Sequence, residues 1–145
     1  MRKILVISTI FVLLISMSMV SALPLKNKDS LIINPDGSFS GFLGFPRTQD
    51  PIILGNISGE YKMRNRGGAF NASWNIDYEN HSGTGTIRCF FGRRLLFARL
   101  TIEGFNQTLP VIGFIGFDTE NLTFFGRAMS YIGPALYFWG NYQPY

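Results

Sequence analysis

Residues 83–140 read GTGTIRCFFGRRLLFARLTIEGFNQTLPVIGFIGFDTENLTFFGRAMSYIGPALYFWG and hold the densest aromatic and β-branched content of the chain. These residue types favour strands, because they fit a pleated, half-buried surface. Glycine, proline and polar clusters interrupt the run at short intervals. The pattern predicts successive short strands joined by turns.

Two segments upstream of this stretch show the clearest strand pattern. Small or apolar residues alternate strictly with polar ones from Gly55 to Met63 and again from Gly68 to Tyr78. A period of two indicates a strand with one buried face. The residues between the segments, Arg64-Asn65-Arg66-Gly67, are the predicted turn.

No segment beyond residue 22 shows convincing helical periodicity. We therefore predict one all-β domain over residues 38–145, an antiparallel meander of about eight strands that forms a closed barrel or a two-sheet sandwich. The expected strands are Ser38–Phe45, Gly55–Met63, Gly68–Tyr78, Thr84–Phe91, Arg94–Ile102, Val111–Phe117, Leu122–Ser130 and Ala135–Tyr142. A short apolar piece, Leu31–Ile33, precedes the first turn within an N-terminal extension of residues 23–37.

Two segments nearly copy each other, Cys89-Phe90-Phe91-Gly92-Arg93 and Thr123-Phe124-Phe125-Gly126-Arg127. An internal repeat and a chance recurrence of glycine–aromatic strings both explain the similarity. Gly92-Arg93 is the expected hairpin turn, with glycine at positive φ. Gly126 marks either a turn or a bulge.

The N-terminus has the three-part layout of a secretory signal. Arg2 and Lys3 precede the apolar run Ile4–Val20, and the small residues Val20-Ser21-Ala22 follow. This layout predicts a signal peptide over residues 1–22, cleaved after Ala22, and a secreted or cell-surface protein. A retained membrane anchor is the alternative, since the run is near the lower length limit for spanning a bilayer.

Five asparagines begin an Asn-X-Ser/Thr triplet, more than chance predicts for a chain of this composition. They are Asn56, Asn71, Asn80, Asn106 and Asn121. Such triplets are acceptors for N-glycosylation in exported proteins. We expect a glycoprotein, and the alternative is a polar β surface rich in Asn, Ser and Thr.

Several chemistries are not expected from this composition. His81 is the only histidine and Cys89 the only cysteine, whereas a zinc site normally needs several such ligands. The chain has no Gly-X-Ser-X-Gly nucleophile elbow, and its carboxylates are not clustered. We predict no catalytic residues, no metal and no cofactor. Cys89 shares strand parity with Ile87 and Phe91, which predicts a buried thiol.

The charge of the chain also limits its partners. The formal net charge is +4, and Arg2 and Lys3 would leave with the signal peptide. The remaining basic residues are scattered, so nucleic-acid binding is not expected. Arg88, Arg99 and Arg127 each lie within an apolar strand, and we expect their side chains to point outward with the stems along the sheet.

The last three predicted strands are apolar on both faces. They could be central in a two-layer packing, form an interface between subunits, or face lipid. An exposed apolar patch of this size would be unusual on a soluble monomer. The favoured prediction is a homo-oligomer or a contact with a cell-envelope partner.

Together these features indicate a non-catalytic, exported β-domain with a structural or interaction role at the cell surface. A barrel that binds a small hydrophobic ligand is the alternative, since barrel mouths often hold ligands. Its candidate lining residues are Trp74, Tyr78, Tyr137 and Trp139. An outer-membrane-type barrel is a third hypothesis.

Overall fold

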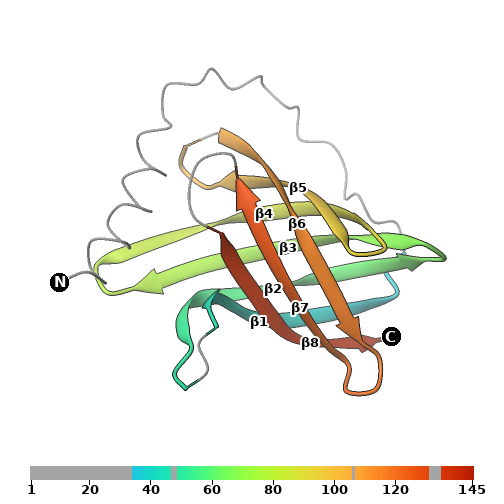
Figure 1. Ribbon diagram of the computed structural model, residues 1–145. Coiled ribbons are helices and arrows are strands. Elements are labelled where there is room, and N and C mark those ends of the chain that lie inside the picture. Colours follow the sequence, from blue (N-terminus) through green and yellow to red (C-terminus); the bar gives the residue numbers. More distant parts are fainter. Residues whose placement is uncertain (1–33, 47–48, 106, 131–134) are drawn as a thin grey trace.

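The computed structural model describes residues 34–46, 49–105, 107–130 and 135–145. Each strand pairs antiparallel with the next along the chain, and the last pairs with the first to close a barrel (Figure 1). The strands are β1 (Gly37–Phe45), β2 (Ile52–Arg64), β3 (Gly67–Tyr78), β4 (His81–Gly92), β5 (Leu95–Ile102), β6 (Gln107–Asp118), β7 (Thr123–Ser130) and β8 (Leu136–Pro144). The predicted all-β fold of eight strands is confirmed, as a closed barrel.

The predicted alternation decides which side chains fill the barrel. On β3, Phe70 and Trp74 are buried while Ser73 and Asn75 are exposed. Successive side chains of a strand point to opposite faces, so the apolar set of each strand points inward. Pairing of β1 with β8 leaves no open sheet edge among the described strands, and exposed edges invite pairing with other chains.

Large inward rings lie over glycines on the neighbouring strand. The register pairs are Trp74 with Gly85, Phe91 with Gly68, and Phe138 with Gly126. A Cβ added at Gly85 would lie 2.7 Å from Cζ2 of Trp74, and one at Gly126 would lie 2.0 Å from Cζ of Phe138. The glycines therefore provide the room that these rings occupy.

Aromatic rings fill the end of the barrel where β1 begins and β8 ends. Phe39 makes edge-to-face contacts with Phe70 and Phe124, at centroid distances of 5.3 and 5.4 Å. Tyr61 and Tyr142 make a similar contact at 5.7 Å. Edge-to-face pairs of this kind add stability beyond the area that they bury. This end is a packed aromatic core.

The two near-copied segments are not equivalent in the fold. Phe91 is buried and Phe90 exposed in the first, whereas Phe124 is buried and Phe125 exposed in the second. Gly126 lies inside β7 beneath a ring, so it is neither a turn nor a bulge. The two segments therefore present opposite members of the Phe-Phe pair to the interior, and an internal repeat stays a prediction.

The predicted turn between β4 and β5 lies at the expected place but has a different conformation. Gly92 still pairs with Leu95, and the residue at positive φ is Arg93, with φ 53°. The expectation of a left-handed glycine was therefore wrong. The Arg93 amide donates to the carbonyl of Arg66 in the neighbouring turn, over 3.0 Å. This bond holds a conformation that a non-glycine residue seldom adopts.

The N-terminal predictions fall outside the described residues. They include the signal peptide at residues 1–22, cleavage after Ala22, the extension to residue 33 and the short piece Leu31–Ile33. These stay predictions. In the ranges that the structure describes, no helix is long and apolar enough to cross a membrane.

Candidate functional site

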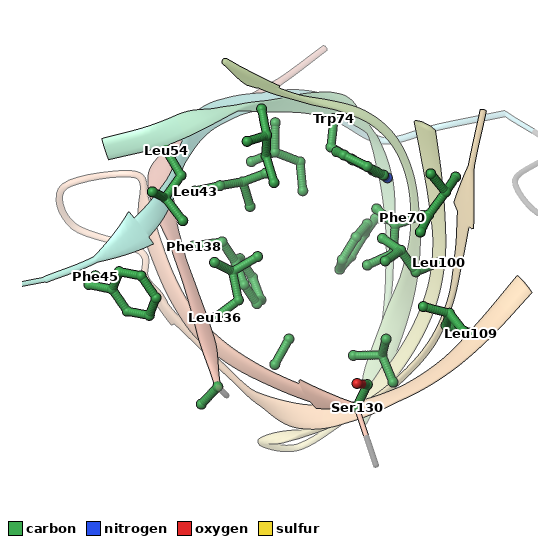
Figure 2. Close-up of a pocket in the computed structure, with 17 residues that line it drawn as sticks. Leu43, Phe45, Leu54, Phe70, Trp74, Leu100, Leu109, Ser130, Leu136 and Phe138 are labelled. Atoms are coloured by element: carbon green, nitrogen blue, oxygen red, sulfur yellow. The ribbon is translucent and has the colours of Figure 1, made fainter. Parts of the chain in front are cut away.

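The half of the barrel opposite the aromatic end contains a cavity of about 150 Å³ (Figure 2). All eight strands contribute to its wall, mainly with the residues nearest the β1–β2, β5–β6 and β7–β8 connections. The lining residues are Leu43, Phe45, Leu54, Ile57, Phe70, Trp74, Ile76, Ile87, Leu100, Ile102, Leu109, Val111, Ala128, Ser130, Ala135, Leu136 and Phe138. The barrel is thus packed at one end and hollow at the other.

None of the described residues that line the cavity has an ionisable side chain. Its polar groups are the hydroxyl of Ser130 and the indole N–H of Trp74, and Figure 2 shows these two residues on opposite walls. A charged ligand would lose its hydration here without gaining a counter-charge, which is very costly. The lining therefore suits an uncharged, largely apolar molecule.

The indole of Trp74 is positioned by the sequence Gly83-Thr84-Gly85 on β4. Cβ atoms added at Gly83 and Gly85 would lie 3.7 and 2.7 Å from the nearest indole carbons. The ring therefore lies against the inner face of β4. Its Nε1 is buried and makes no hydrogen bond, although an unpaired buried donor costs about 1–3 kcal/mol.

A β-bulge brings Leu54 into the cavity wall. Leu43 pairs with Gly55 and Gly44 pairs with Ile53, so Leu54 is the unpaired extra residue of β2. Its side chain is buried and lines the cavity. A regular strand in the register of Gly55–Met63 would point Leu54 outward, so simple alternation misses this residue. The adjacent Gly55 was the signal, since glycine within a strand often marks a bulge.

Of the four candidate lining residues, only Trp74 lies in the wall of the cavity. Trp74 lines the cavity, whereas Tyr78 lies at the end of β3 and is not part of the wall. Tyr137 lies on the outside, 5.6 Å below the guanidinium of the exposed Arg127. Trp139 is also outside and contacts Phe42 at a ring-centroid distance of 6.3 Å. The assignment of Tyr137 and Trp139 to a barrel interior is therefore corrected.

The asparagines of the described Asn-X-Ser/Thr triplets lie on the outer wall or in turns. Asn56, Asn80 and Asn121 are exposed, Asn71 is half-buried on the outer face of β3, and Asn106 lies outside the described residues. Asn121 donates from its side chain to Oδ2 of Asp118 over 2.8 Å. Outward placement is compatible with glycans, whose presence stays a prediction.

The surroundings of two ionisable groups of the described chain, Cys89 and Asp118, shift their pKa values. Cys89 is fully buried, and burial raises the pKa of its thiol well above the ordinary range, so the nucleophilic thiolate is disfavoured. The side chain of Asn121 holds the pKa of the Asp118 carboxyl below its usual value, which suits a turn contact. Over the described ranges, no group of three or more His, Cys, Asp and Glu could hold a metal ion.

The charged residues within apolar strands point outward, as expected. Arg88, Arg99 and Arg127 are exposed on the outer face, and Arg88 pairs directly with Arg99 across β4 and β5. None of them reaches the cavity wall.

Comparisons of the chain with protein-family models, with curated proteins and with solved structures found no match.

Proposed function

We propose that this protein binds a small, uncharged, largely apolar ligand in the hollow half of its barrel. The observation that supports this proposal is the apolar cavity of about 150 Å³ beside an aromatic end whose void is only about 10 Å³. An eight-stranded barrel is wide enough either to be filled by side chains or to hold one small ligand. In this barrel, side chains fill one half and the other half contains the cavity.

The cavity volume bounds the size of the ligand. A cavity of about 150 Å³ lined by Leu, Ile and Phe stays dry and accepts a molecule the size of benzene. The ligand would therefore be a small aromatic or a short aliphatic compound.

A structural or interaction role at the cell surface is the second candidate function. Large apolar side chains on the outer wall favour it, since Phe90 and Phe97 are each 57% exposed. The predicted export and glycosylation fit either function. The predicted homo-oligomer would use this same outer wall.

The arrangement of polar and apolar side chains disfavours an outer-membrane-type barrel. Such barrels carry an outward apolar band and a polar interior. In this barrel the described interior is apolar, and the outer faces of β2 and β3 carry polar side chains such as Glu60, Asn75 and Asp77.

Fluorescence of Trp74 provides a direct test of ligand binding. The chain has two tryptophans, so Trp139→Phe on the outer wall leaves Trp74 as the only reporter. Titration with benzene, naphthalene and hexanol is expected to change its emission in a saturable way. The smallest compounds should bind most readily, because the cavity limits size.

A pair of leucine substitutions distinguishes the cavity from the outer surface. Ala128→Leu places a larger side chain in the cavity wall, while Ala69→Leu makes the same change on the outer face of β3. We expect Ala128→Leu to abolish saturable binding without lowering the unfolding temperature, and Ala69→Leu to bind as the parent does. Equal binding by the two variants, or no saturable change with any compound, would refute the proposal.

A further inference from the structure

A contiguous apolar patch covers the outer wall from β4 to β7. We define this outer patch as Phe90, Leu95, Phe97, Ile112, Phe114 and Phe125, whose side chains are 49% to 57% exposed. Phe90 pairs with Phe97 and Phe97 with Ile112, while Leu95 pairs with Phe114 in the next row. Residues paired directly across strands on one face have side chains in contact range.

The exposed area of the outer patch is at the upper end of the range for soluble monomers. If a fully exposed aromatic or large aliphatic side chain offers about 200 Å², the six residues together expose about 600 Å². The largest apolar patch of a typical soluble monomer lies between about 300 and 600 Å² and often has a function. Trp139 pairs with Phe125 and extends the apolar surface toward β8.

Most of the charged groups around the outer patch are positive, and the exception on these strands is Asp118, one row away from Phe125 on the same face. Arg88 and Arg99 lie one row away from Phe90 and Phe97 on the same face, and Arg127 pairs with Phe114. Arg93 and Arg94 form the adjoining turn between β4 and β5. Strands β4, β5, β7 and β8 contain no Asp or Glu, and β6 has only Asp118 at its end.

The outer wall formed by β2 and β3 is neither apolar nor uniformly positive. The outer faces of β2 and β3 are polar and include Glu60, Lys62 and Asp77. Two of the predicted glycosylation positions, Asn56 and Asn71, also lie there. The barrel therefore has one wall that suits water and one that is apolar and cationic.

We propose that the outer patch docks on the surface of a membrane that contains anionic lipids. The aromatic and aliphatic side chains enter the boundary between headgroups and acyl chains, and the bordering arginines bind lipid phosphates. Interfacial binding of this type depends on buried apolar area together with attraction to anionic lipids. Arginine suits this role because its planar guanidinium can donate two hydrogen bonds to one phosphate.

The same charges disfavour a second copy of the chain as the occupant. In a symmetric dimer the same surface patch serves both subunits. The arginines bordering one patch would then approach those of the other, and Asp118 is the only acidic side chain on strands β4 to β8 that could offset them. Juxtaposed like charges oppose association. The proposal does not depend on the cavity or its ligand.

Vesicle co-sedimentation tests the docking. The full chain is produced in one secreting host, so that the parent and all variants carry the same N-terminus. Binding is compared on vesicles of pure phosphatidylcholine and on vesicles in which about one third of the lipid is phosphatidylserine. We expect stronger binding to the anionic vesicles, and this preference should weaken as salt is raised, because salt screens charge.

Two double variants and their matched controls locate the surface. Phe97→Thr with Phe114→Thr removes two patch rings, and Phe105→Thr is the control, since Phe105 is similarly exposed, at 52%, but lies in the β5–β6 connection. Arg88→Gln with Arg99→Gln removes two bordering charges, and Arg64→Gln on β2 is the control. Each bordering arginine should contribute about fivefold to binding of anionic vesicles. Circular dichroism checks that each variant is folded.

These experiments distinguish an anionic membrane from a second copy of the chain as the partner of the outer patch. Loss of vesicle binding in both double variants, with binding retained in both controls, supports the proposal. Equal binding to neutral and anionic vesicles, unchanged binding in the double variants, or no binding by the parent overturns it. A different outcome would assign the outer patch to a dimer interface instead. In that case the parent does not bind vesicles, light scattering shows a dimer, and Phe97→Thr with Phe114→Thr dissociates it.

Discussion

Replacement of Gly126 by alanine tests whether a glycine beneath an inward ring shapes the hollow barrel. The added Cβ would lie 2.0, 2.4 and 2.6 Å from the Cζ, Cε2 and Cε1 atoms of Phe138. Carbon atoms in contact are normally separated by about 3.5–4.0 Å. Phe138 must therefore move, and because its ring also lines the cavity, it can move into that space.

The expected cost follows from two opposing effects. Overpacking a core by one methyl group typically costs about 1–3 kcal/mol. Alanine in place of glycine also restricts the unfolded chain, which contributes about 0.4–1 kcal/mol of stability where the backbone tolerates it. We expect a net loss of about 1–2 kcal/mol, or a fall of several degrees in unfolding temperature, together with weaker binding of benzene-sized ligands.

Gly116 is the matched control. It lies on β6 beside β7, faces outward, and an added Cβ would find only the Phe125 carbonyl oxygen, 3.9 Å away. Urea denaturation should show Gly116→Ala to be as stable as the parent or slightly more stable. Adding Phe138→Leu to Gly126→Ala should recover part of the loss, because the smaller side chain relieves the overlap. Equal stability of Gly126→Ala and Gly116→Ala would refute the argument.

Two further outcomes are expected. Burial holds the pKa of Cys89 above its unfolded value of about 8.5, so at higher pH the unfolded chain loses a proton that the folded chain keeps. Stability should thus be unaffected by this thiol below about pH 8.5 and fall above it by up to about 1.4 kcal/mol per pH unit. Urea unfolding across this range checks the slope, and Cys89→Ala should remove the contribution of the thiol. Mass spectrometry of protein from a secreting, glycosylating host should find a chain beginning at Leu23 whose mass falls after enzymatic removal of N-glycans. A full-length chain with an unchanged mass would contradict both the cleavage and the glycosylation predictions.

The predictable part of this fold is the part in which polarity alternates. On β3 the alternation places Phe70 and Trp74 inside and Ser73 outside, as the structure has them. From Leu136 to Gly140 every residue of β8 is apolar or aromatic, so composition cannot distinguish Phe138 from Trp139. Only pairing with β7 and β1 decides that Phe138 faces the cavity and Trp139 the outer wall. The interior placement of Trp139 failed for this reason.

Hydrophobic periodicity also could not predict features that depend on the pairing of one strand with another. Leu54 enters the cavity because a bulge shifts its register against β1. The role of Gly126 depends on a ring that approaches from β8. Such pairings link residues distant in sequence, whereas periodicity reports only on neighbours. The cavity itself could therefore be anticipated only as a general property of barrels.

The energetic cost of the cavity strengthens the case for a ligand. Unfilled apolar space costs about 24 cal/mol per Å³ relative to a packed core, so about 150 Å³ corresponds to at most about 4 kcal/mol when no water enters. A domain of this size is stable by only about 5–15 kcal/mol in total, and a single cysteine excludes an intramolecular disulfide. The same barrel packs its other end with aromatic rings, so this cost does not arise from an inability of eight strands to close around a full core. A bound apolar molecule would recover much of it, which predicts that ligands of the right size raise the unfolding temperature while larger ones do not.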